Sequence, residues 1–171
     1  MRTLLTCLLV LLAASGFSQT ASFISFKDTL NHFAIDIPSG WQYSSSKGLP
    51  LIAQRKPAET ADKSHESFNV NVINKKTPST VEREYEKFIG YLKSTNNFTL
   101  LESDTITING QACKWFVETH KNDGDGVTLM CNYVFITYKN DKTYILTFAT
   151  LAADFSKYRQ LFYKIAETLV I

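Results

Sequence analysis

The sequence predicts an α+β protein in which an antiparallel β-sheet meander is flanked by helices, an α/β/α sandwich. Several segments alternate apolar and polar residues, as half-buried strands do. Two other segments place apolar residues at helical spacing. Short turn sequences lie between the last strands, which indicates that these strands are joined as hairpins. With 171 residues, 44% of them hydrophobic, the chain has the size of one domain and enough apolar surface for a core.

The first eighteen residues resemble a cleavable secretory signal peptide. Arg2 gives a positive start, residues 4–14 are apolar apart from Thr6 and Cys7, and small residues lead up to Ser18. The apolar run is much shorter than the roughly twenty residues that a spanning helix needs, and no later segment is longer. We therefore expect a signal peptide over 1–18, cleaved near Ser18, and a single mature domain over 19–171. The expected location is the periplasm or the outside of the cell.

The first half of the mature domain contains short strands. Phe33, Ile35 and Ile37 alternate with polar or small residues, and residues 38–40 end this strand with turn chemistry. The remaining expectations for this half are an extended run from Trp41, a loop over 44–50, a short strand over 51–55, a polar segment over 56–66 and a strand over 68–73.

Two amphipathic helices are predicted. Ser79 and Glu82 have the spacing of a capping box at the start of the first helix, and Asp154 is a suitable N-cap for the second. The apolar stripes are Val81, Tyr85, Phe88, Ile89 and Leu92 in the first helix, and Phe155, Tyr158, Phe162, Ile165 and Leu169 in the second.

Between the two helices, four consecutive strands form the predicted meander. Asn109-Gly110 is a strong signal for a two-residue hairpin turn. The strands are expected over 98–108, 111–119, 127–138 and 143–152, with further turns over 121–126 and 139–142.

The segment from Phe33 to Trp41, with its Ile-Pro-Ser-Gly-Trp corner, resembles the opening strand and corner of PsbP/Mog1-like proteins. Residues 106–112, a strand, an Asn-Gly turn and a small residue, resemble the same family, and so does the order of elements from about residue 22 to 171. The resemblance implies a sandwich used as a binding or assembly module, with roles as different as photosystem II subunits and a small-GTPase binder. Fold alone does not fix function.

The leading hypothesis from the sequence is an exported, non-enzymatic module of the bacterial envelope whose partner is another envelope protein. Such a module should expose an apolar or aromatic patch. The alternatives are a carrier of a small apolar ligand, with a pocket between a helix and the sheet, and, less favoured, an unrecognised hydrolase. Outside the leader, 17 basic residues balance 16 acidic ones, which gives no basis for a nucleic-acid partner.

Cys113 and Cys131 are the two cysteines that remain after processing, and an oxidising compartment makes a disulfide between them possible. A hairpin centred near residue 122 would place them opposite each other. A turn centred one or two residues later would misalign them, and a bridge needs Cα atoms within about 7 Å. The alternative is a pair of small buried side chains.

No catalytic or metal-binding set is predicted, and no cofactor is expected. His32, His65 and His120 lack the spacing of a zinc site, and there is no Gly-rich phosphate loop. Residues 122–126 resemble a calcium loop only superficially, because Lys121 stands where the first ligand should be. Turn chemistry is the better explanation of this segment.

Overall fold

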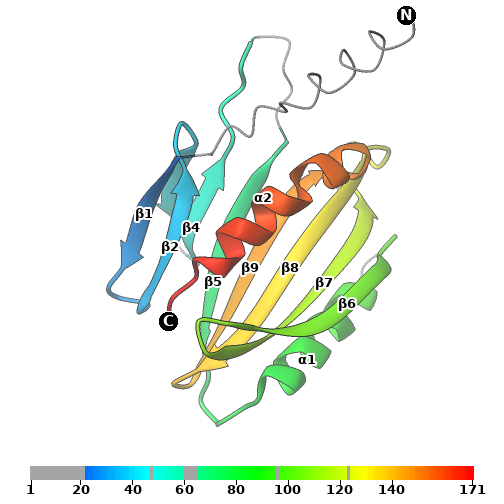
Figure 1. Ribbon diagram of the computed structural model, residues 1–171. Coiled ribbons are helices and arrows are strands. Elements are labelled where there is room, and N and C mark those ends of the chain that lie inside the picture. The colour runs from blue at the N-terminus through cyan, green and yellow to red at the C-terminus, as the bar shows by residue number, and fades with distance from the viewer. Residues whose placement is uncertain (1–21, 47, 60–64, 95–96, 123) are drawn as a thin grey trace, which may run out of the picture.

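In the computed structural model, which describes residues 22–46, 48–59, 65–94, 97–122 and 124–171, the chain forms a seven-stranded antiparallel sheet, a two-stranded hairpin and two helices (Figure 1). The α+β prediction is confirmed. The expected signal peptide, 1–18, lies outside the described residues. The strands are β1 (Phe23–Asp28), β2 (Phe33–Pro38), β3 (Gln42–Ser46), β4 (Leu49–Gln54), β5 (Ser67–Asn74), β6 (Thr99–Ile108), β7 (Gln111–Lys121), β8 (Leu129–Lys139) and β9 (Lys142–Leu151). The helices are α1 (Val81–Lys93) and α2 (Phe155–Glu167), and the 3-10 turn η1 (Ala152–Asp154) precedes α2.

The strand order in the large sheet is β3-β4-β5-β9-β8-β7-β6, so the meander β6 to β9 forms one half of it. Side chains alternate between the two faces, as the period of two requires. In β8, Tyr133 and Phe135 pack into the core on the α2 side, whereas Val134 and Ile136 pack on the α1 side. The central strands are therefore buried on both faces.

The two helices cover opposite faces of the sheet (Figure 1). On one face, α1 packs on β7 and β8, with Ile89 against Phe116 and Val134. On the other face, α2 packs on β8, β9 and the β1–β2 hairpin. Fully burying a side chain such as Phe162 of α2 contributes about 2 kcal/mol. No helix among the described residues is long and apolar enough to cross a membrane.

The Asn109-Gly110 turn has the predicted two-residue form. Both residues have positive φ, 47° and 77°, as a type I′ hairpin requires. The turn at 140–141 has the same geometry, with φ of 50° and 56°. Asn109 also ties the turn to the end of α2, because its Nδ2 donates to the carbonyl oxygens of Glu167 (3.0 Å) and Leu169 (2.8 Å).

The helix starts differ from the prediction. The N-cap of α1 is Thr80, whose Oγ1 accepts from the Arg83 amide at 3.2 Å, and not Ser79. Ser79 instead donates its hydroxyl to the buried carboxylate of Glu84. Asp154 makes no capping bond, because the 3-10 turn η1 leads the chain into α2 and leaves Asp154 with helical dihedral angles.

The sequence analysis also missed part of the sheet. The strand β1, which pairs with β2, was not predicted, and β3 and β4 extend into the expected loop over 44–50. Every residue of β3 is exposed, so this edge strand has no apolar alternation to reveal it. Beyond α2, Val170 forms an isolated antiparallel bridge with Ala34.

Candidate functional site

A pocket of about 480 Å³ opens on the α1 face, near the end of the sheet where β7 turns into β8. We call it the end pocket. It forms because α1 stops at Lys93, whereas the same face of β7 continues past Phe116 to Glu118 and His120. The side chains that line the end pocket include Tyr91, Leu92, Phe98, Glu118, His120 and Asn132.

Glu118 is the buried charge of this pocket, with 2% of its surface exposed. His120 Nδ1 donates to the Glu118 carboxylate, 3.0 Å from Oε1 and 3.2 Å from Oε2. Asn132, its register partner on β8, also hydrogen-bonds the carboxylate. Burial raises the pKa of Glu118, and the contacts with His120 and Asn132 only partly oppose this.

Exposed apolar side chains surround the end pocket. Leu100 is the register partner of Glu118, and Val127 follows Gly126 in the pocket wall. Four of the ten large apolar residues that are exposed in the described part of the chain belong to this group. We call the group the apolar rim: Tyr91, Leu100, Leu101 and Val127.

The end pocket places a carboxylate–imidazole pair beside apolar surface. A carboxylate that holds one imidazole nitrogen can orient a histidine as a general base. However, none of the described residues that line the pocket is a Ser, Thr or Cys that could serve as a nucleophile. Apolar surface around a few hydrogen-bonding groups, here the buried Glu118 and the partly exposed His120, is typical of a recognition site.

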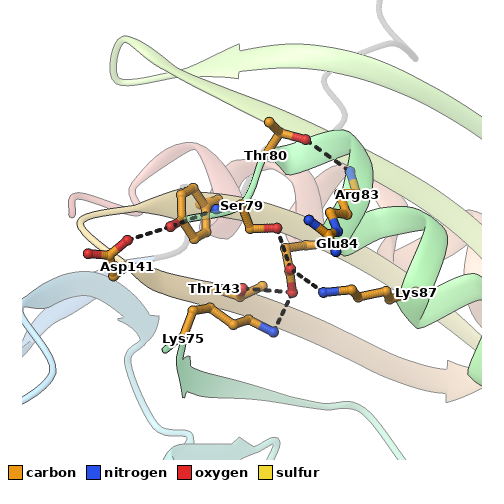
Figure 2. A network of polar contacts seen from close by, with 9 residues as sticks. Lys75, Ser79, Thr80, Arg83, Glu84, Lys87, Asp141 and Thr143 are labelled. Carbon is orange, nitrogen blue, oxygen red and sulfur yellow. Dashed lines mark hydrogen bonds and ion pairs between the residues drawn. The ribbon is translucent and has the colours of Figure 1, made fainter. Parts of the chain in front are cut away.

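A second buried carboxylate, Glu84 of α1, faces the same side of the sheet but has a full set of donors (Figure 2). Its Oε1 accepts from Ser79 Oγ at 2.6 Å and from Lys87 Nζ at 3.2 Å. Its Oε2 accepts from Thr143 Oγ1 at 3.0 Å and forms an ion pair with Lys75. Burial alone would raise the pKa of Glu84, but these contacts outweigh it and hold the pKa at about 2. This network fastens the start of α1 to the sheet.

A third feature, the α2 cleft, lies on the opposite face, between α2 and the strands β6 to β8. Its volume is about 450 Å³. Arg159 at its side forms a two-pronged ion pair with Glu102, Nη1 to Oε1 at 2.6 Å and Nη2 to Oε2 at 2.8 Å. The side chains that line the cleft include Asp104, Ile106, Trp115, Tyr133, Arg159 and Tyr163.

The possible disulfide does not form. The β7–β8 hairpin pairs Cys113 with Thr137 and Cys131 with Thr119, so the cysteines are six positions apart in register. That offset is about 20 Å along a strand, far beyond the reach of a bridge. Both thiols are free and buried, and burial raises the pKa of each to about 12. The hairpin is centred on Asp125, three residues later than a disulfide would require.

Only one histidine reaches a candidate site. His120 lines the end pocket, whereas His32 and His65 line neither the end pocket nor the α2 cleft. In the turn after β7, Asp125 Oδ1 accepts from the amides of Val127 and Thr128, both at 2.9 Å. Within the described residues, no group of three His, Cys, Asp or Glu side chains is arranged to hold a metal ion.

The architecture, a seven-stranded antiparallel sheet between two helices, is that of the PsbP/Mog1-like class of proteins. The family model described as PsbP matches residues 21–171, so the chain belongs to the PsbP family, as the resemblance suggested. No curated protein sequence matches this chain.

Solved structures share the fold at low sequence identity. The solution structure of PsbP from the cyanobacterium Synechocystis sp. PCC 6803 has a TM-score of 0.63 at 15% identity, and covers 94% of this chain and 98% of its own. The Ran-binding protein Mog1p of Saccharomyces cerevisiae has a TM-score of 0.61 at 12% identity, with 88% and 96% covered. LpqN of Mycobacterium tuberculosis, described as involved in cell envelope biogenesis, has a TM-score of 0.54 at 12% identity, with 90% and 86% covered.

Proposed function

We propose that this chain is an exported, non-catalytic binding module that docks on another protein of the bacterial envelope. The apolar rim is the observation that carries the proposal, because exposed apolar side chains concentrated around a pocket mark a protein-interaction site. Mog1p, which has the same fold, is named as a Ran-binding protein, and LpqN is described as involved in envelope biogenesis. Both descriptions agree with a role in binding or assembly.

The end pocket gives the interface its specificity. Apolar contacts on the rim would exclude water, and Glu118 and His120 at the pocket would accept or donate hydrogen bonds to a polar group of the partner. Once the interface covers them, Glu118 and the partly exposed His120 discriminate between partners, because a partner without the matching group leaves them unsatisfied.

The test is a pair of matched substitutions at opposite ends of the sheet. Val127 and Leu30 are equally exposed, at 80% and 81%, but only Val127 belongs to the apolar rim. Leu30 lies at the other end, where its carbonyl is 3.4 Å from Lys142 Nζ. The wild type, Val127→Asp and Leu30→Asp are expressed in the native host, crosslinked mildly and affinity-purified, and the bound proteins are identified by mass spectrometry.

A specific partner should be recovered with the wild type and with Leu30→Asp and be lost with Val127→Asp. In a purified mixture, Val127→Asp should bind that partner about tenfold more weakly, which corresponds to about 1.4 kcal/mol. Equal recovery with all three proteins, or no reproducible partner, would contradict the proposal.

A second candidate function is the transport of a small ligand in the α2 cleft. The volume of the cleft is in the range of small-molecule sites, and Trp115 and Tyr133 supply aromatic surface. However, Asp104 and Arg159 also line it, which argues against a wholly apolar ligand. Native mass spectrometry of the purified wild type tests this function: a co-purifying small molecule supports it, and a bare chain argues against it.

A further inference from the structure

The strand β6 is a long open edge of the sheet. It is the last strand in the sheet order and pairs with β7 alone among the described strands. Proteins usually protect such edges with short strands, Lys or Pro. The ten residues of β6 include neither Lys nor Pro. A bulge interrupts its register between Leu100 and Glu102, but the pairing is regular from Glu102 to Ile108.

One backbone donor marks the outward side of this edge. The amide of Thr105 donates to Oδ1 of the neighbouring Asp104 at 2.7 Å. The amides of an edge strand alternate between the partner strand and solvent, and a local side chain reaches those on the solvent side. The Asp104 carboxylate thus occupies a position that the carbonyl of an added strand would take.

The α2 cleft runs alongside the same edge. Asp104 and Ile106 of β6 belong to its wall, and Trp115 and Tyr133 continue it across β7 and β8. A strand added to β6 would place its side chains within about 5.5 Å of those of β6 on the same face. Every second side chain of that strand would therefore enter the cleft.

The charges of the cleft define the side chain that fits. Arg159 is neutralised by its two-pronged ion pair with Glu102. Asp104 forms no ion pair with any described residue, so one negative charge is left uncompensated beside the ring of Trp115. A cation placed there would gain both an ion pair and a cation–π contact.

We propose that an extended peptide segment of a partner protein adds to β6 as an eighth strand and places a Lys or Arg side chain in the α2 cleft, between Asp104 and Trp115. Main-chain hydrogen bonds along the regular part of β6 provide affinity, and the cleft provides selectivity for the basic residue. This surface is separate from the apolar rim, and the proposal does not rest on the function of the rim.

The probe is a library of random ten-residue peptides displayed on phage, selected on the purified wild-type chain. Enriched peptides should share a Lys or Arg flanked by β-branched residues at alternate positions. The best peptide is then synthesised in two forms, one with its basic residue and one with Glu in that place, and the binding of each is measured by fluorescence anisotropy.

Two variants of the edge test the geometry. Thr105→Pro removes the outward amide, whereas the control Thr105→Val keeps it, so only the Pro variant should weaken binding, by about tenfold or more. Asp104→Lys should weaken binding of the basic peptide about tenfold and improve binding of the Glu form. Because Asp104 is exposed, this variant remains a test of the proposal if Thr105→Pro does not fold.

The outcomes separate the alternatives. A library that yields no binder, enriched peptides without a basic residue, or binding unchanged in both variants would each overturn the proposal. A concentration-dependent dimer of the wild type that Thr105→Pro abolishes would make a second copy of this chain the occupant, and would overturn it as well. Val127→Asp should leave peptide binding unchanged, so failure here and failure of the apolar-rim function are distinguishable.

Discussion

Glu84 and Glu118 are both buried on the α1 face of the sheet, yet their surroundings differ. Four side chains form hydrogen bonds or ion pairs with Glu84. They belong to α1, to the segment before it and to β9. Within the described part of the chain, Glu118 is bonded by His120 and Asn132, and it lies beyond the end of α1, beside the end pocket. The pKa of Glu84 is lowered to about 2, whereas that of Glu118 is raised.

The difference separates a structural carboxylate from one available for recognition. A buried carboxylate with a full set of donors holds its charge at little cost and adds stability to the fold. A buried carboxylate with too few donors lowers the stability of the fold. Such destabilising groups are retained where they have a functional role, such as binding. We therefore expect opposite effects on stability when each charge is removed.

The largest effect should come from Glu84→Gln. This substitution leaves Lys75 without its buried partner, and breaking a buried pair costs about 3 kcal/mol or more. Urea unfolding at neutral pH measures the loss. The control is Glu82→Gln, whose side chain is 56% exposed and pairs with Lys114 at 3.0 Å, and which should change stability by less than about 0.5 kcal/mol. Equal effects of the two substitutions would show that the Glu84 network is not an anchor.

The same network predicts how stability depends on pH. Because the folded pKa of Glu84, about 2, lies below its ordinary value of 4.5, its contribution is complete above pH 4.5 and is lost as the pH falls from 4.5 towards 2. The difference between these two pKa values corresponds to about 3 kcal/mol in the free energy of unfolding. Glu84→Gln should abolish this part of the acid sensitivity.

A smaller loss of stability is expected from Ser79→Ala, which removes one hydrogen-bond donor and keeps the charge of Glu84. A hydrogen bond to a charged group contributes about 1.5 kcal/mol or more. The free energy of unfolding of Ser79→Ala, measured by urea titration, should lie between those of the wild type and Glu84→Gln. Thr80→Ala separates this effect from capping, because Thr80 bonds the Arg83 amide and does not touch Glu84. The folded pKa of Glu84, followed by NMR, should rise in Ser79→Ala and stay unchanged in Thr80→Ala.

The smallest effect, of opposite sign, is expected from Glu118→Gln, which should stabilise the chain by about 1 kcal/mol at neutral pH. Since the folded pKa of Glu118 is raised, its contribution is most favourable at low pH and declines as the pH rises through that pKa. His120 and Lys121 are the other ionisable groups of β7 at this pocket. The gain in stability should therefore grow as the pH rises above 4.5, the ordinary pKa of a glutamate, in thermal unfolding experiments. A loss of stability at every pH would mean that Glu118 supports the fold as Glu84 does.

The sequence predicted the meander and both helices because their signals are local. The turn signals on either side of β8 and the Asn109-Gly110 turn depend on residues close together in the chain, and the structure has this strand and this turn close to where they were expected. The second part of β3 could not be predicted, since all of the side chains of this strand are exposed and its hydrogen bonds to β4 define it. The N-cap of α1 was misplaced because Ser79 bonds a carboxylate whose burial becomes evident only in the folded chain.

The candidate site was less predictable than the fold. The apolar rim joins Tyr91 of α1, Leu100 of β6 and Val127 of the turn before β8, residues that no sequence pattern connects. The i, i+2 spacing of Glu118 and His120 was the one available signal, although His120 lies one residue beyond the predicted strand 111–119. In the structure β7 continues to Lys121 and places both side chains on one face. In the structure His120 bonds Glu118, which lies two residues before it on the same strand.

Because Cys113 and Cys131 are six positions apart in register, the outcome of oxidation depends on whether the chain is already folded. In the folded sheet both thiols are buried and protonated, so an oxidant finds no thiolate to attack. In an unfolded chain nothing keeps the two sulfurs apart, and a bridge formed then is compatible only with a hairpin slipped by six residues. Because the slip is even, each side chain would keep its face, so the crosslinked hairpin would bury apolar surface and persist as a misfolded species. The order in which the chain folds and meets an oxidant therefore decides which of two covalent products it becomes.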